Sequence, residues 1–342
     1  MTLAAAIRTG DAGLLPSRRD EDWRWTDLRG LLRVLPDASA AFAGDAGAGP
    51  FSALGGEDLV LVNGGRAEIA VEAGEARQVC LRFVSRGAGR HASVVRVTLG
   101  EGARLRLLES YESDGASLAQ VDLDIVQAGQ ARVERVVIAD DDADAVTVSQ
   151  TQVRLSPGSR FSQSVLTSGA RRQRLETRIL HPGGQAELRL DGIYLLDGKR
   201  HADLTTVVTH QGVDGATGQL TKGVVRDQSR AVFQGRITVA EGADRTAARM
   251  AHHGLILSDR AEIDAKPELE IYADDVACAH GNTVGALDQD ALFYALQRGI
   301  PADEALALLT EAFIGEVVDR IEFEPARDIA RAWVTARLGG RP

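Results

Sequence analysis

The stretch VTVSQTQVRLSPGSRFSQSVL, residues 146–166, holds two runs of alternating apolar and polar residues around a turn at Gly158. Alternation with a period of two places the apolar side chains on one face of an extended chain, which is typical of a β-strand. Similar runs, interrupted by glycine-containing turns, follow one another from about residue 57 to residue 277 with no helical pattern between them. The sequence therefore predicts that this part of the chain is mainly β.

The glycine turns recur at a nearly constant spacing. The intervals are 27, 29, 26 and 58 residues, the last being twice 29, for turns at Gly102, Gly129, Gly158, Gly184 and Gly242. A candidate for the turn missing from the longest interval lies in HQGVDGATGQ, residues 210–219. Such spacing is typical of a coiled stack, as in a parallel β-helix, where each turn buries its apolar face against its neighbours. A large sandwich or barrel also spaces its turns regularly, so the repeat alone leaves that alternative open.

The two flanks of the β region have a different pattern. Residues 4–10 (AAAIRTG) and 20–35 (DEDWRWTDLRGLLRVL) have helical features, whereas residues 36–50 lose periodicity and are rich in Ala and Gly, as in a linker. Helical spacing returns after residue 286. We therefore expect an N-terminal helical segment with its linker over residues 1–55, a β core over 56–286 and a C-terminal helical subdomain over 287–342.

The C-terminal part predicts three helices, the last in EPARDIARAWVTARL, residues 324–338. Asp288 is placed to cap the first helix, Gly299 to end it, and Pro301 suits the first turn of the second. These signals depend only on residues next to each helix end, so they predict where the helices begin and end.

The second of these helices carries more apolar residues than one face needs. Residues three and four apart, Leu308 and Phe313 among them, form one apolar stripe that we expect to face the core. Leu306 and Ile314 lie off this stripe. They predict a second apolar patch that is free for a partner.

Composition excludes several classes of protein. A net charge of −10 opposes nucleic-acid binding, and the basic segment SGARRQRLETR, residues 168–178, is expected to be solvated surface because strand geometry divides its arginines between two faces. No run approaches the roughly 20 apolar residues of a membrane helix, and the N-terminus lacks the pattern of an export signal. Two cysteines are too few for a disulfide framework, so we expect a cytoplasmic protein.

Familiar catalytic motifs are missing from the sequence. It has no P-loop, no HExxH, no G-x-S-x-G elbow and no pair of C-x-x-C units, and aromatic residues are only 4%. A metal- or carbohydrate-dependent enzyme built on a β-helix, or a homodimeric structural protein, stays open as an alternative. A catalytic role is not expected of the isolated chain.

The stretch YADDVACAHGNTVG, residues 272–285, contains the candidate ligand pair Cys278 and His280. Residues two apart on a strand share a face, and a thiolate with an imidazole suits zinc, copper or an iron–sulfur site. Structural zinc needs four protein ligands and catalytic zinc three, so this pair is at most part of a site. Either the residues are structural, or a second protein supplies the remaining ligands.

The other cysteine and histidines have simpler interpretations. Cys80 lies in a strand pattern and is expected in the core. His252 and His253 are adjacent, so on a strand they would face opposite ways and could not share a metal. The isolated histidines are expected to be hydrogen-bonding or surface residues; they are His181, His201 and His210.

Residues 255–300, LILSDRAEIDAKPELEIYADDVACAHGNTVGALDQDALFYALQRGI, resemble the SufB/SufD family of the SUF iron–sulfur cluster assembly machinery, and most of all its SufD members. EDWRWTDL (21–28), GIYLLDGKRHADLTTVVTH (192–210) and RAVFQGRITV (230–239) share the resemblance. A SufB-like chain would typically carry more cysteines and an acidic residue where this chain has Asn282.

The resemblance implies a right-handed parallel β-helix with helical regions at both ends, acting as a scaffold without catalytic residues. Its partners would be a SufB-like protein, paired through the β-helices, and a SufC-like ATPase, with a homodimer as an alternative in isolation. No cofactor would be stably bound to the chain alone. ATP would be used by the ATPase, which would dock on the C-terminal helices through Leu292, Phe293, Leu306, Phe313 and Ile314.

The resemblance also assigns the ligand pair. In such complexes a transient iron–sulfur cluster forms at the interface between the two β-helices. His280 matches the histidine that contributes to this site, so it would bind metal only together with ligands from the partner. Cys278 matches a cysteine close to the same interface.

Overall fold

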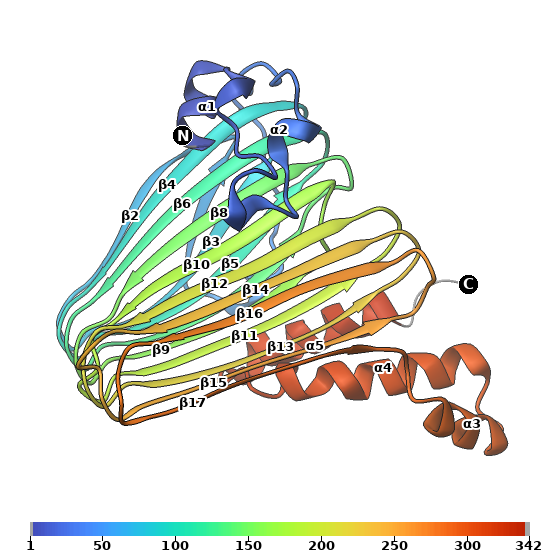
Figure 1. Ribbon diagram of the computed structural model, residues 1–342. Coiled ribbons are helices and arrows are strands. Elements are labelled where there is room, and N and C mark those ends of the chain that lie inside the picture. The colour runs from blue at the N-terminus through green and yellow to red at the C-terminus, as the bar shows by residue number, and fades with distance from the viewer. Residues whose placement is uncertain (1–2, 339–342) are drawn as a thin grey trace.

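The strands wind alternately through two parallel sheets, as Figure 1 shows. The computed structural model describes residues 3–338. In this part of the chain one sheet has nine strands in the order β1-β3-β5-β7-β9-β11-β13-β15-β17, and the other has eight in the order β16-β14-β12-β10-β8-β6-β4-β2. Each strand pairs with the one two places further along the chain, which makes a parallel β-solenoid with two strands in each turn.

The nine-stranded sheet contains β1 (Glu57–Val62), β3 (Ala76–Ser85), β5 (Arg104–Ser113), β7 (Arg132–Asp140), β9 (Arg160–Thr167), β11 (Glu187–Leu196), β13 (Ala216–Val225), β15 (Thr246–Ile256) and β17 (Val276–Gly285). The eight-stranded sheet contains β2 (Gly65–Val71), β4 (Gly89–Leu99), β6 (Ser117–Gln127), β8 (Val146–Arg154), β10 (Arg172–His181), β12 (His201–His210), β14 (Arg230–Val239) and β16 (Glu262–Ile271). One face of each sheet lines the interior of the solenoid.

The repeat seen in the sequence corresponds to one turn of the solenoid. Paired positions on β5, β7, β9, β11 and β13 are 28, 28, 27 and 29 residues apart, at Arg104, Arg132, Arg160, Glu187 and Ala216. The missing turn is residues 211–215, where Asp214 has φ +60° and its N–H donates to the carbonyl of Asp244 at 3.0 Å. The stack is confirmed. The sandwich and barrel alternatives are wrong, because the strands of both sheets pair in parallel with those two places along the chain, as at β5–β7 and β10–β12.

The interior is a packed core. Phe161, Tyr194 and Phe233 are at most 1% exposed and belong to one apolar cluster, which extends from β2 to β15. An ion pair is buried among them: Arg135 donates to Glu109 at 2.7 and 2.8 Å. Each turn covers the apolar side chains of the one before it, and this burial stabilises the stack by about 25 cal/mol for each Å² removed from water.

The C-terminal helices are α3 (Gln289–Gln297), α4 (Ala302–Val318) and α5 (Glu324–Leu338). The predicted signals are largely confirmed: the Asp288 side chain accepts from the N–H groups of Asp290 and Ala291, and Gly299 follows α3 with φ +81°. Pro301 differs slightly, since it immediately precedes α4 as its N-cap.

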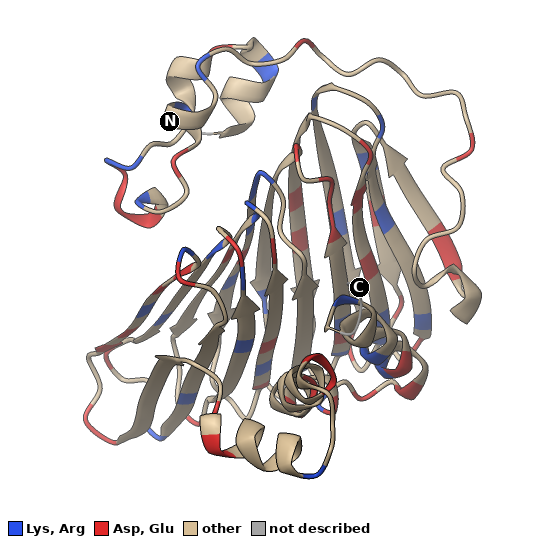
Figure 2. Ribbon diagram, turned by 90° about the vertical axis from the view of Figure 1, so that its right-hand side faces the viewer, with Lys and Arg blue, Asp and Glu red and all other residues tan. Residues whose placement is uncertain are grey.

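Two of these helices pack on the outer face of the nine-stranded sheet. Ile314 and Val317 of α4 and Trp333 of α5 are buried in one cluster with outward side chains such as Leu108 and Ile193. Figure 2 shows that the helices cover only part of this face. The prediction for α4 is wrong for Leu308, which was expected to face the core but is 50% exposed, and for Ile314, which was expected to be free for a partner but is fully buried. The sheet surface, and not the apolar spacing alone, sets the rotation of the helix.

Residues 3–35 of the N-terminal segment lie on the outer face of the eight-stranded sheet, whereas Phe51, further along, packs on the outer face of the nine-stranded sheet. It contains the short helices α1 (Leu3–Thr9) and α2 (Leu28–Leu31) and 3-10 turns at Ala12–Leu14 and Glu21–Trp23. The helix expected over residues 20–35 is therefore mostly absent. Thr26 donates to Asp203 at 2.5 Å, and the Trp23 ring lies against the guanidinium of Arg174 at 4.5 Å. These contacts with the sheet replace regular helical structure. None of the helices within residues 3–338 is long and apolar enough to cross a bilayer.

Candidate ligand site at the open end of the solenoid

The last turn of the solenoid carries both predicted ligand residues. Cys278 and His280 lie on β17, which pairs with β15 on one side and, within residues 3–338, has no neighbouring strand on the other. Their partners in register are Ala248 and Met250, which point into the core. Both candidate residues therefore occupy inward-facing positions, but no further turn covers them. This is why His280 is exposed although its position in the turn is that of a core residue.

The two candidate side chains differ in their surroundings. Within residues 3–338, His280 makes no side-chain hydrogen bond or ion pair, so both ring nitrogens are available. Cys278 is half-buried beside the core cluster, and burial raises the pKa of its thiol while a backbone hydrogen bond with Ala248 opposes that shift. The thiol is therefore protonated at neutral pH, and binding a metal would displace its proton.

A neighbouring histidine forms the wall behind this site. His252 is buried on β15 and stacks on Phe233 with ring centroids 4.5 Å apart. Its Nδ1 donates to the side-chain oxygen of Asn282 at 2.7 Å, and its Nε2 accepts from the Tyr194 hydroxyl at 2.9 Å. Burial lowers the pKa of His252 to about 4, so the ring is neutral. His252 thus holds Asn282, two residues from His280, in place.

The register of β15 and β17 explains why the contact between His252 and Asn282 could not be predicted from the sequence. The sequence predicts that His252 and His253 face opposite ways, and the structure agrees: His253 contacts Thr283 on the outside, at 2.7 Å. The link from His252 to Asn282 spans one turn of 30 residues, so only the alignment of β15 with β17 reveals it.

Cys278 and His280 could not complete a metal site by themselves. In the part of the chain that the structure describes, no three His, Cys, Asp or Glu side chains come close enough to hold a metal ion. A metal ion that bound one imidazole and one thiol of this chain would need at least one or two more ligands from another molecule.

The residues predicted for ATPase docking do not share one environment. Phe293 on α3 is 63% exposed, whereas Leu292, Leu306 and Phe313 are half-buried. Ile314 is fully buried on the side of α4 that faces the sheet. Further large apolar side chains, which were not predicted to dock the ATPase, are exposed on the same two helices; they are Tyr294, Leu296 and Leu308. None of the nine residues of α3 is buried.

The fold and this site define a class of protein: a parallel β-solenoid whose open last turn presents a thiol and an imidazole, Cys278 and His280. The chain belongs to the SufBD family, because residues 83–313, more than half of it, match the family described as "SUF system FeS cluster assembly, SufBD core domain". The resemblance inferred from residues 255–300 is thereby confirmed.

Individual relatives agree with this assignment. The chain is similar to the iron–sulfur cluster assembly protein SufD of Escherichia coli, with 28% identity over 99% of this chain and 92% of that protein. It is similar to a SufBD family protein of Mycobacterium tuberculosis, with 26% identity over 96% and 90% of the two chains. SufD of Bacillus subtilis is 34% identical over 37% of this chain and 29% of that protein.

Proposed function

We propose that this chain is a scaffold of SUF iron–sulfur cluster assembly that pairs with a SufB-like partner at its open end and contributes His280 to the nascent cluster. The observation that carries the proposal is the position of His280, which faces the interior of the solenoid but lies uncovered at its last turn. The β core, residues 56–286, would be the pairing module. The cluster is the cargo of the complex, and the missing ligands come from the partner.

The last turn has the features of a pairing surface. β17 and β16 are the outer strands of their sheets, so their free backbone groups can pair with strands of another chain. Large apolar side chains are exposed beside this edge, at Ile271, Tyr272 and Val284. A second solenoid stacked here would cover His280 and Cys278 and exclude water from the cluster.

The helices α3 and α4 are the proposed site for the ATPase. Figure 1 shows α3 projecting away from the solenoid. Only residues 286–288 separate β17 from α3, so a pull on α3 acts directly on the strand that carries His280. ATP binding and hydrolysis by a SufC-like partner would in this way open and close the pairing surface. We place this assembly in the cytoplasm.

His280→Ala is expected to reduce cluster assembly at least tenfold in cells that depend on this chain, because a first ligand has no substitute in the described part of the site. The complex with the SufB-like partner should still form. Incorporation of iron and sulfide into the purified complex measures the effect.

Thr283→Ala is the matched control, since Thr283 lies on the outward face of the same strand. It should leave cluster assembly close to that of the unchanged chain. Normal assembly in the His280 variant would remove the ligand role, whereas loss of the complex in both variants would point to the strand edge instead.

Phe293→Ser combined with Tyr294→Ser is expected to weaken binding of the SufC-like ATPase at least tenfold, because exposed aromatic side chains commonly dominate the energy of an interface. Gln297→Ser, an exposed change in the same helix, should have little effect. Calorimetric titration of the ATPase against each variant measures the difference. Equal affinities for all three chains would place the docking site elsewhere.

A further inference from the structure

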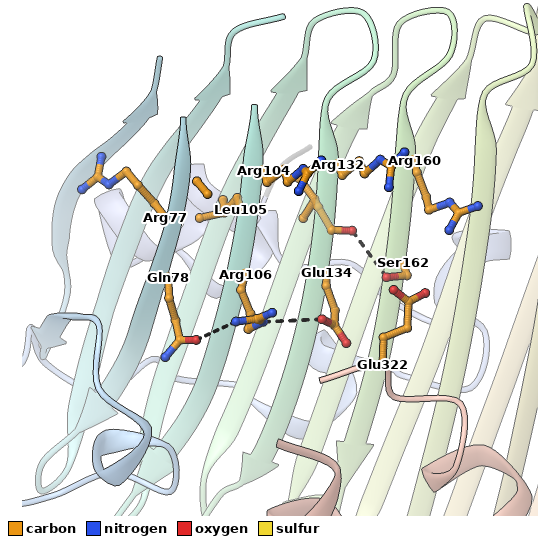
Figure 3. Close-up of a pocket in the computed structure, with 12 residues that line it drawn as sticks. Arg77, Gln78, Arg104, Leu105, Arg106, Arg132, Glu134, Arg160, Ser162 and Glu322 are labelled. Atoms are coloured by element: carbon orange, nitrogen blue, oxygen red, sulfur yellow. Dashed lines mark hydrogen bonds and ion pairs between the residues drawn. The ribbon is translucent and has the colours of Figure 1, made fainter. Parts of the chain in front are cut away.

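A ladder of arginines crosses the outer face of the nine-stranded sheet. Arg104, Arg132 and Arg160 occupy the same position on β5, β7 and β9 and pair in register. Figure 3 shows them side by side along one wall of a cavity, with Arg106 and Glu134 in the next row. Neighbouring strands lie about 4.8 Å apart, so three exposed cations are stacked at close spacing.

The chain neutralises this ladder only in part. Arg160 forms an ion pair with Glu187 at 2.5 Å. Arg104 and Arg132 make no side-chain hydrogen bond or ion pair within residues 3–338. Like charges that lie directly opposite one another on paired strands destabilise a sheet. The ladder is therefore a cost to the fold that an anionic ligand would remove.

The ladder belongs to a longer trough. Two cavities of about 440 and 470 Å³ share Arg160, Ser162 and Glu322, the last from the connection between α4 and α5. Eight arginines and three glutamates line the two cavities; the arginines are Arg77, Arg104, Arg106, Arg132, Arg160, Arg189, Arg249 and Arg320. Two further carboxylates pair with them, Glu57 with Arg77 and Asp191 with Arg189 and Arg320, which leaves a formal charge of +3 in a chain of −10. From β3 to β15 the trough crosses six strand spacings, about 29 Å.

These features select among anionic ligands. The length exceeds that of a single nucleotide. Among the described residues that line the trough the one aromatic side chain, Phe161, is fully buried, so bases of a single-stranded nucleic acid would have nothing to stack on. Guanidinium groups pair bidentately with carboxylates, which occur at intervals along an acidic peptide.

We propose that this trough binds an acidic, extended segment of a protein partner, with Arg104 and Arg132 as its main anchors. About nine extended residues span 29 Å. The trough lies on the outer face of the sheet and does not include β17, α3 or His280. The inference is therefore independent of the proposed assembly role.

The test uses the full chain and a fluorescein-labelled peptide of ten glutamates, with a Gly-Ser peptide of equal length for comparison. Fluorescence anisotropy should show binding of the glutamate peptide alone, with affinity that falls as salt rises. Arg104→Gln with Arg132→Gln should weaken it about tenfold or more. Arg66→Gln with Arg154→Gln removes the same charge from the exposed surface of the other sheet and should change the affinity less than twofold.

The proposal would be overturned if the glutamate peptide did not bind, or if both double variants weakened its binding equally. It would also be overturned if a twenty-nucleotide oligothymidine or inorganic triphosphate bound more tightly at the same arginines. Thermal unfolding of each variant shows whether misfolding explains a loss of peptide binding. Because the changes relieve repulsion, the Arg104 and Arg132 variant should melt no lower than the unchanged chain.

Discussion

Arg174→Ala is expected to lower the free energy of unfolding by about 3–5 kcal/mol. Arg174 is fully buried and donates to Glu176 at 2.8 Å, to Asp203 at 2.7 Å and to the carbonyl of Asp22 at 2.7 Å. Its loss would leave the buried carboxylate of Asp203 without a cation and that of Glu176 with only the part-exposed Arg178. It would also remove the surface on which Trp23 packs. Urea denaturation at pH 7 measures the loss. Proteolysis within residues 11–35 should also accelerate, since this cluster holds the N-terminal segment.

Arg178→Ala is the control for this prediction. Arg178 pairs with Glu176 and Asp22 in the same cluster, but its side chain is 43% exposed, so its ion pairs are screened by water. Its removal should cost at most about 1 kcal/mol. Similar losses for the two variants would show that burial of the charge does not determine the energy of the cluster.

Acid is expected to unfold the protein well before its carboxylates are all protonated, because histidines are buried in the neutral form. His181 and His210 are adjacent in register, with ring centroids 4.3 Å apart. Burial lowers the pKa of His181 to about 4 and that of His210 to about 3, and a charge on His181 further opposes one on His210. The Nδ1 of His181 accepts from the Gly183 N–H at 3.1 Å, a bond that protonation would break.

The lowered pKa values of the two histidines determine the direction in which stability changes with pH. Above pH 6.5 both the folded and the unfolded states have neutral rings, so the stability is fully present. As the pH falls from 6.5 toward 4, the unfolded chain gains protons that the folded chain cannot accept, and each histidine removes up to about 1.4 kcal/mol per pH unit. Urea denaturation between pH 7 and pH 4.5 measures this slope.

His210→Gln tests the origin of the slope. Glutamine can keep a hydrogen bond with Thr217, which lies 2.9 Å from the Nε2 of His210, but it does not titrate in this range. The variant should therefore lose stability less steeply between pH 6.5 and pH 4.5, whatever its stability at pH 7. An unchanged slope would mean that other groups control the acid transition.

Local features of the fold could be predicted because their causes are local. The period-two runs place Phe161 inward, the Gly and Asp turns recur every 27 to 29 residues along β5 to β13, and Asp288 and Gly299 bound α3. The turn at residues 211–215 could be located from the spacing of the glycine turns alone. Cys80 is buried as expected, beneath Phe51 on the outer face of β3.

The candidate site could be predicted only in part. The spacing of Cys278 and His280 places them on one face of a strand, and the family resemblance directs attention to them. That His280 is uncovered depends on β17 being the last strand of its sheet. Arg174 shows the opposite error: its position on the outer face predicted exposure, but residues 22 and 23, about 150 positions away, cover it.

The sequence by itself therefore determined the two-strand repeat, the direction in which each side chain points within its strand, and the ends of the C-terminal helices. These follow from interactions between residues a few positions apart. Tertiary structure alone decided which outward faces are covered, which arginines stack in a ladder, and which inward residues remain open at the last turn. The physical reason is that successive turns align residues about 28 positions apart, and the flanking segments cover faces that the strand pattern cannot distinguish from solvent-exposed ones.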